Sequence, residues 1–157
     1  MKKIVLYATL VITLASCGGA KQFVTYTHGE PLSERKSRIY VMYKTKNLEL
    51  LPTIITLFSN GERVGTIERK GYLAFDVPAG IEYALYATTG NREGYIANGA
   101  AGDDHFKINA KGGKIYYLRL NPKNRAIGRV YNLEYLDSAK GERKLKRHSR
   151  PKLNYVE

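Results

Sequence analysis

Two carboxylates and an imidazole stand together at Asp103-Asp104-His105, and these residue types bind divalent cations. Calcium needs several oxygen ligands, and zinc needs three or four ligands in a fixed geometry. Neighbouring residues in an extended segment point alternately apart, and the other histidines, His28 and His148, lie near the two ends of the chain. We therefore interpret these residues as a solvated loop that offers possible binding groups, and we expect neither a bound metal nor another cofactor.

Other catalytic arrangements are not recognisable in the sequence. The serines after the first apolar segment lie in terminal segments or turns, outside any Gly-x-Ser-x-Gly motif that would present a nucleophile. Several carboxylates are available to a glycosidase, but no pair is singled out. Phosphate-binding loops and dinucleotide fingerprints are missing. We therefore expect a protein without catalytic activity. An envelope hydrolase ranks third, after the two binding functions described below.

The chain begins with a basic start and a short apolar run. Met1-Lys2-Lys3 precedes the mainly apolar residues from Ile4 to Leu14. This run is about half of the roughly 20 residues that a membrane-spanning helix requires, so it has the layout of a secretory signal peptide. The sequence Leu14-Ala15-Ser16-Cys17-Gly18 follows and contains the only cysteine, which excludes an internal disulfide.

Leu14-Ala15-Ser16-Cys17-Gly18 resembles the lipobox of bacterial lipoproteins. The resemblance implies cleavage before Cys17, a diacylglyceryl thioether on Cys17 and acylation of the new amino group. Two or three acyl chains anchor a protein stably, whereas one binds membranes only marginally. The residues directly after Cys17 include no acidic one, which in lipoprotein sorting favours the outer membrane and a periplasmic orientation. The alternative is an ordinary signal peptide that ends near a free cysteine.

Short runs of alternating apolar and polar residues fill the centre of the chain. Asn60-Gly61, Lys70-Gly71 and Pro78-Ala79-Gly80 are turn signals between them. The alternation predicts strands over 38–44, 53–58, 63–68, 72–77, 82–89, 105–109, 115–120 and 129–136. Seven or eight short strands without a long helical period predict an all-β fold, an antiparallel β-sandwich.

Four parts of this pattern occur in a fixed succession: Arg38-Ile39-Tyr40-Val41 and residues 59–67, 71–80 and 112–119. This succession resembles a bacterial lipoprotein domain, domain of unknown function 2846, over about residues 38–136. It implies an immunoglobulin-like or prealbumin-like sandwich. It supplies no catalytic residues.

The resulting organisation has four segments. They are a signal peptide at 1–16, the acylated cysteine with a flexible lipid tether at 17–37, the β-sandwich at 38–139 and a basic tail at 140–157. The tether is rich in Gly, Ser, Thr and charge, and residues 18–37 would reach at most about 70 Å when fully extended.

Tyrosines and one long loop are candidate binding features. Exposed tyrosines on a sheet stack on sugar rings, although tyrosine also packs well inside ordinary strands. The segment 89–104, which contains Tyr95, is long and patternless, as many binding loops are; simple mobility explains it equally well. These features support an alternative function as a carbohydrate- or peptidoglycan-binding module.

Much of the net charge lies in the C-terminal segment. The chain has 26 Lys and Arg against 14 Asp and Glu, or +12, and residues 140–152 account for 7 − 1 = +6. The basic residues there are Lys140, Arg143, Lys144, Lys146, Arg147, Arg150 and Lys152. Such a run is typically a disordered extension, here at the end opposite the lipid and interrupted by Pro151, after which 153–156 form a possible edge strand.

Near an anionic membrane each basic residue contributes about 1 kcal/mol of binding free energy. The candidate contacts to an anionic lipid or an envelope protein are Lys144, Lys146, Arg147 and Arg150. A nucleic-acid partner conflicts with export. We therefore expect a lipid-anchored binding or assembly module of the cell envelope, on the periplasmic face of the outer membrane.

Overall fold

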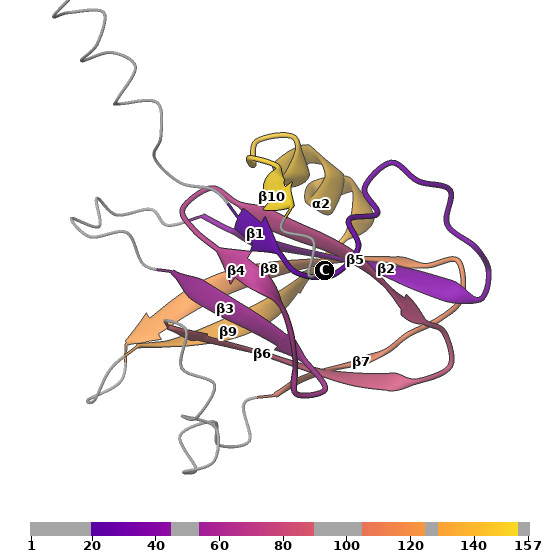
Figure 1. Ribbon diagram of the computed structural model, residues 1–157, viewed down its shortest axis with the longest axis horizontal. Helices are drawn as coiled ribbons and strands as arrows, with labels where there is room; N and C mark the ends of the chain where they lie inside the picture. The colour runs from indigo at the N-terminus through magenta and orange to yellow at the C-terminus, as the bar shows by residue number, and fades with distance from the viewer. Residues whose placement is uncertain (1–19, 45–53, 90–104, 125–128, 154–157) are drawn as a thin grey trace, which may run out of the picture.

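The computed structural model describes residues 20–44, 54–89, 105–124 and 129–153 (Figure 1). Within these ranges the chain forms two β-sheets and one short helix, α2 (Ser138–Leu145). The strands are β1 (Ala20–Gln22), β2 (Lys36–Tyr43), β3 (Ile55–Ser59), β4 (Glu62–Ile67), β5 (Tyr72–Pro78), β6 (Glu82–Thr89), β7 (Phe106–Asn109), β8 (Ile115–Asn124), β9 (Arg129–Leu136) and β10 (Pro151–Leu153). The eight predicted strands correspond to β2 through β9, so the all-β prediction is confirmed.

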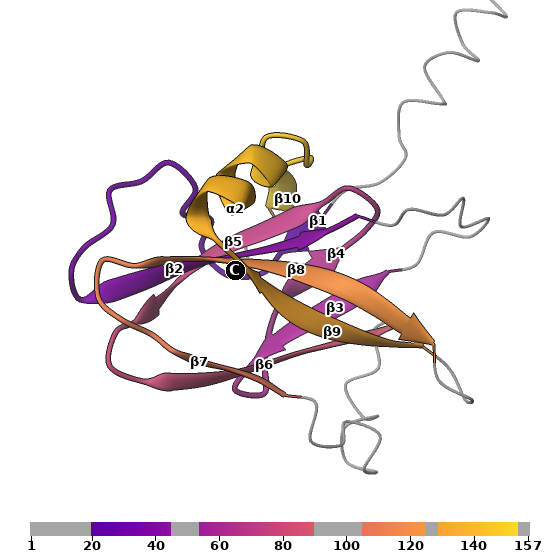
Figure 2. The ribbon, with the colours of Figure 1, turned by 180° about the vertical axis from the view of Figure 1, so that it is seen from behind.

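The strands form one six-stranded and one four-stranded sheet (Figures 1 and 2). Their orders are β10-β1-β4-β3-β6-β7 and β5-β2-β8-β9. Both sheets are mixed, because β1 runs parallel to β10 and β2 runs parallel to β8. The predicted purely antiparallel arrangement is therefore wrong. Hairpin signals report only neighbouring strands, whereas both parallel pairs join segments that are far apart in the sequence.

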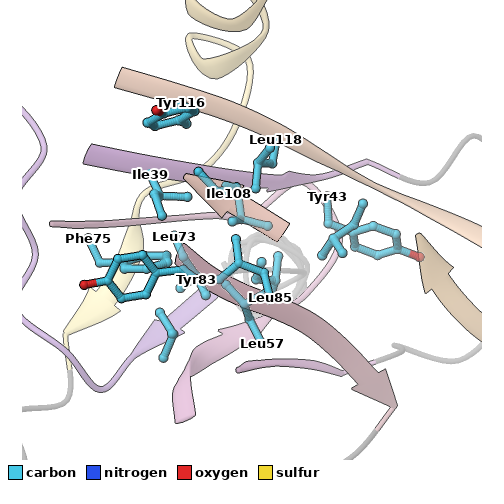
Figure 3. Close-up of a cluster of buried hydrophobic side chains, with 14 of the residues drawn as sticks. Ile39, Tyr43, Leu57, Leu73, Phe75, Tyr83, Leu85, Ile108, Tyr116 and Leu118 are labelled. Carbon is cyan, nitrogen blue, oxygen red and sulfur yellow. The ribbon is translucent and has the colours of Figure 1, made fainter. Parts of the chain in front are cut away.

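Apolar side chains from both sheets form one core between them (Figure 3). Ile39 of β2 and Leu118 of β8 share this core with Leu57 of β3 and Leu85 of β6, and all four are fully buried. Each such side chain contributes about 1.5–3 kcal/mol by leaving water. The predicted inner face of β5 is confirmed, because Leu73, Phe75 and Val77 all belong to the core.

Glycine has a specific role at two positions of the six-stranded sheet, one in a turn and one inside a strand. The β3–β4 hairpin turns at Asn60 (φ 49°) and Gly61 (φ 86°), the left-handed conformations that a two-residue hairpin requires. A bulge follows, because Leu57 pairs with Gly65 while Phe58 pairs with Arg63. An added Cβ at Gly65 would lie 2.5 Å from the carbonyl oxygen of Lys21, so this glycine also lets β1 approach β4.

The N-terminal residues 20–37 are folded into the domain, which corrects the predicted flexible tether over 17–37. β1 lies between β10 and β4, and Gln22 is buried. The Gln22 side-chain amide donates to the Ala74 carbonyl (2.6 Å) and accepts from the Ala74 N–H (3.1 Å). It thus makes the two hydrogen bonds that the backbone of a neighbouring strand would make with Ala74 of β5. A three-residue strand is too short to show a period, so the sequence pattern missed it.

The position of β1 shortens the connection to Cys17. Only three peptide units separate Cys17 from Ala20, so their Cα atoms are at most about 11 Å apart, in place of the roughly 70 Å expected for a free tether.

Residues 138–153 are also folded into the domain, which corrects the prediction of a disordered basic tail for the described part of 140–157. Helix α2 starts at Ser138 and β10 pairs with β1. Pro151 begins β10 instead of ending regular structure there, because an edge strand tolerates a missing N–H. The basic segment thus lies beside the N-terminal strand, not at the opposite end of the domain. Residues 154–156 of the predicted edge strand lie outside the described residues.

We expect Gln22→Ala to lower the free energy of unfolding by about 2–4 kcal/mol, because it leaves the buried N–H and C=O of Ala74 without partners. Urea denaturation at 25 °C measures the change. Lys21→Ala, at the exposed neighbouring position, is the control and should change stability by less than about 0.5 kcal/mol. Equal stability of Gln22→Ala and the unsubstituted protein would contradict this role of the side chain.

Candidate functional site

The two ends of the described chain lie side by side in the six-stranded sheet. Ala20 pairs with Pro151 and Lys21 pairs with Lys152 in the parallel β1–β10 ladder. Lys21 and Lys152 are both exposed. Figures 1 and 2 show that α2 lies at the same side of the molecule as this pair. The lysines are therefore neighbours in a surface that includes both ends of the described part of the chain.

Helix α2 packs on β8 through one small and one apolar residue. The Asp137 side chain caps its start by accepting from the N–H of Lys140 (2.8 Å). Gly141 is buried against the Tyr117 ring, where an added Cβ would overlap the ring atoms, and Leu145 is also buried. Two basic side chains of the helix, Lys140 and Arg143, are exposed on its outer side.

A histidine closes the other end of α2. The Lys144 carbonyl accepts hydrogen bonds from Nδ1 of His148 (2.7 Å) and from the N–H of Arg147 (2.9 Å). Nε2 of His148 is buried and has no hydrogen-bond partner in the described parts of the chain. Burial lowers the pKa of His148, against the opposing effect of the hydrogen bond to Lys144. The imidazole therefore prefers its neutral form in the folded protein.

Beyond the helix the chain turns into β10. The Ser149 N–H donates to the Lys70 carbonyl (2.7 Å), which holds this connection against the turn between β4 and β5. The basic edge, as we call it, consists of the exposed lysines of the β1–β10 pair and the exposed basic residues of the segment that leads from α2 into β10: Lys21, Lys146, Arg147, Arg150 and Lys152.

Lys144 belongs to a neighbouring polar cluster and not to the basic edge. It is half-buried, and burial followed by the charges of Arg119 and Lys140 lowers its pKa. On the sheet nearby, Asn121 and Arg119 donate to Glu134 (2.6 and 2.5 Å). These bonds, in that order, lower the pKa of Glu134 and keep it ionised, so this cluster contains its own counter-charge.

The segment from 23 to 35 covers the outer face of the four-stranded sheet with an aromatic cluster. The hydroxyls of Tyr26 and Tyr72 are hydrogen-bonded (2.7 Å), and Nδ1 of His28 is hydrogen-bonded to Tyr40 (3.0 Å). Tyr40 also stacks on Tyr117, with ring centroids 5.2 Å apart. Burial raises the pKa of Tyr117 to about 12, so its hydroxyl stays protonated at neutral pH.

A buried ion pair ties the same segment to β2 and β5. Arg38 donates two hydrogen bonds to Asp76 (2.7 and 3.1 Å) and one to the Glu30 carbonyl (2.6 Å). Thr27 adds a hydrogen bond to Asp76 (2.9 Å). Burial, then the charges of Arg150 and Arg38, lowers the pKa of His28. The basic edge therefore acts electrostatically on this cluster.

Several predicted site residues, namely Cys17, Tyr95, Asp103 and Asp104, lie outside the described residues. His105 is described; it is exposed and stacks on Tyr86 with centroids 5.0 Å apart. Tyr86 stacks in turn on Phe58 at 4.9 Å. Among the described residues no three His, Cys, Asp or Glu side chains are grouped as a metal site requires.

Most tyrosines of the described ranges are buried. Tyr135 is exposed and Tyr26 is half-buried. The buried ones are Tyr40, Tyr43, Tyr72, Tyr83, Tyr86, Tyr116, Tyr117 and Tyr131. A flat platform of several exposed tyrosines is therefore not found in this part of the chain.

Sequence reasoning placed Lys146, Arg147 and Arg150 among the candidate residues but missed Lys21 and the packing of α2. The Asp137-Ser138 step before the basic run is a helix-start signal that could have predicted α2. The neighbourhood of Lys21 and Lys152 depends on a long-range strand pairing and has no local signal.

No family model, no curated protein and no solved structure matches the chain. In the described ranges no helix has the length and apolar character needed to cross a membrane.

We expect Gly141→Ala to destabilise the protein by about 1–3 kcal/mol, because the new methyl group overlaps the Tyr117 ring. In a solvated, unpacked tail the same change would be neutral or would favour helix by about 1 kcal/mol. Urea denaturation measures the sign. Arg143→Ala, at an exposed position of the same helix, is the matched control and should stay within about 0.5 kcal/mol.

Stability should fall as the pH is lowered from about 7.5 to 5.5, starting as the pH passes the ordinary histidine pKa of about 6.5. The pKa values of His28 and His148 are lowered on folding, so the unfolded chain binds protons at a higher pH than the folded chain does. Protonation therefore stabilises the unfolded state relative to the folded state. We expect His148→Gln to reduce the slope of unfolding free energy against pH without abolishing it, since His28 remains. Urea titrations at successive pH values measure the slope, and an unchanged slope would contradict the assignment.

Proposed function

We propose that the protein is a lipid-anchored binding or assembly module of the bacterial cell envelope without catalytic activity. The N-terminal pattern supports a signal peptide over 1–16 and acylation of Cys17. The observation that carries the proposal is the position of β1. It starts three residues after Cys17 and is hydrogen-bonded into the sheet, so an acylated Cys17 would hold the folded domain directly at a membrane.

The outer membrane, with the domain facing the periplasm, fits the absence of acidic residues directly after Cys17. The partners in this proposal are the membrane, through Cys17, and an anionic lipid or an envelope protein, through the basic edge. Cofactors and nucleic acids have no role in it. For the fold we propose an immunoglobulin-like or prealbumin-like sandwich, supported by the resemblance to domain of unknown function 2846 and by the shared core of the two sheets.

A carbohydrate- or peptidoglycan-binding module is the second candidate. It is favoured by the aromatic stack of Phe58, Tyr86 and His105, which is separate from the residues of the core between the sheets. His105 is its exposed member and directly follows the loop 89–104. Binding to purified sacculi that is unaffected by His105→Ala and Tyr135→Ala would remove this candidate.

The anchor is tested by growing cells that express the full chain with labelled palmitate. We expect label in the unsubstituted protein, no label in Cys17→Ala, and accumulation of the longer precursor in the presence of globomycin, because acylation and cleavage both depend on that cysteine. Lys21→Ala, outside the lipobox, is the control and should keep the label. Label that persists in Cys17→Ala, or that never appears, would contradict the proposal.

A further inference from the structure

We propose that the basic edge, Lys21, Lys146, Arg147, Arg150 and Lys152, is a docking surface for the phosphates of anionic lipid headgroups. The inference deepens the proposed function and rests on it, because it assigns the membrane-contacting surface of the anchored domain and the chemistry of its partner.

The covalent connection to the anchor limits how far this surface can lie from the lipid. Cys17 and Ala20 are at most about 11 Å apart. Ala20 precedes Lys21 directly and pairs with Pro151, so Arg150 and Lys152 flank its partner. This upper limit is comparable with the Debye length of about 8 Å in physiological salt, so an anionic surface at Cys17 still attracts the nearest of these charges, and more strongly at lower salt. An acyl group on Cys17 therefore brings the basic edge into the field of the headgroups.

The charges of the basic edge are not neutralised within the described fold. The ion pairs found among the described residues use Arg38, Lys107 and Arg119, and none uses a side chain of the basic edge. Lys21 and Lys152 are direct neighbours across the β1–β10 ladder, and like charges at paired positions repel. A phosphate between or above them would remove this repulsion.

A lipid surface fits these residues better than a protein partner. Protein interfaces have an apolar centre and are depleted in lysine. The large apolar side chains exposed in the described ranges are Val24, Ile54, Ile81 and Tyr135. They come from four separate segments of the chain, and none belongs to the basic edge. Clustered Lys and Arg beside a membrane anchor instead match the electrostatic attraction of anionic lipids.

The test uses the processed chain, residues 17–157 with Cys17→Ser, which retains every described strand and has no acyl chain. Its sedimentation is compared between vesicles of phosphatidylcholine alone and vesicles that also contain phosphatidylglycerol. We expect binding only to the anionic vesicles, and its loss in 0.5 M salt. Inorganic phosphate at equal ionic strength distinguishes a lipid surface from a site for free phosphate: strong competition at millimolar phosphate would overturn the lipid assignment.

Two triple variants remove the same charge from different surfaces. Each basic residue close to an anionic surface contributes about fivefold in affinity, so Lys146→Ala/Arg147→Ala/Lys152→Ala should weaken vesicle binding by at least about tenfold. Arg35→Ala/Lys36→Ala/Lys111→Ala removes three exposed charges elsewhere and should change binding by less than about threefold. Thermal unfolding of both variants confirms that they remain folded.

Equal losses in the two variants would mean that only net charge matters and would overturn the assignment to the basic edge. No binding to anionic vesicles would overturn it in favour of a protein partner. The outcome is separable from that of the anchor experiment: vesicle binding by a chain that takes up no palmitate would refute the anchor alone, and a labelled chain that ignores phosphatidylglycerol would refute the docking surface alone.

Discussion

The pairing of β1 with β4 and β10 is the constraint on which the rest of the molecule depends. The three residues of β1 pair with β4 on one side and with β10 on the other. The Gln22 side chain adds hydrogen bonds to β5 of the other sheet. Gly65 permits this close approach. Without β1, the polar groups of β4 and β10 along this line would lose their partners, and the two sheets would lose a polar connection in addition to their shared core.

This pairing also changes the meaning of the net charge. After loss of Lys2 and Lys3 with a signal peptide, 24 basic and 14 acidic residues would remain, or +10, of which residues 140–152 supply 7 − 1 = +6. In the sequence this charge stands far from Cys17. In the fold the end of this segment lies next to the first strand, because β10 pairs with β1. Part of the positive charge therefore lies at the strand from which the chain leads to Cys17, where Lys21 and Lys152 are paired.

Prediction from sequence succeeded where the physical cause was local. Strands β2 to β9 were found because alternation of side chains has a period of two, and the β3–β4 turn was found because Asn60 and Gly61 tolerate positive φ. Prediction missed β1, α2 and the start of β10 at Pro151. The two strands are too short for a period to appear, and long-range contacts of Gln22, and of Gly141 and Leu145, stabilise β1 and α2 respectively.

The sequence by itself thus determined the strand-rich composition of the domain, its turns, its single cysteine and the clustering of basic residues, since each of these follows from residue type and spacing along the chain. The tertiary structure decided that both sheets are mixed, that residues 20–35 and 138–153 are folded into the domain, and that Lys21 stands beside Lys152. The physical reason is that strand pairing connects backbone groups regardless of their separation in sequence. The burial of side chains such as Gln22 and Leu145 determines which segments become neighbours. Local sequence patterns do not predict these long-range pairings.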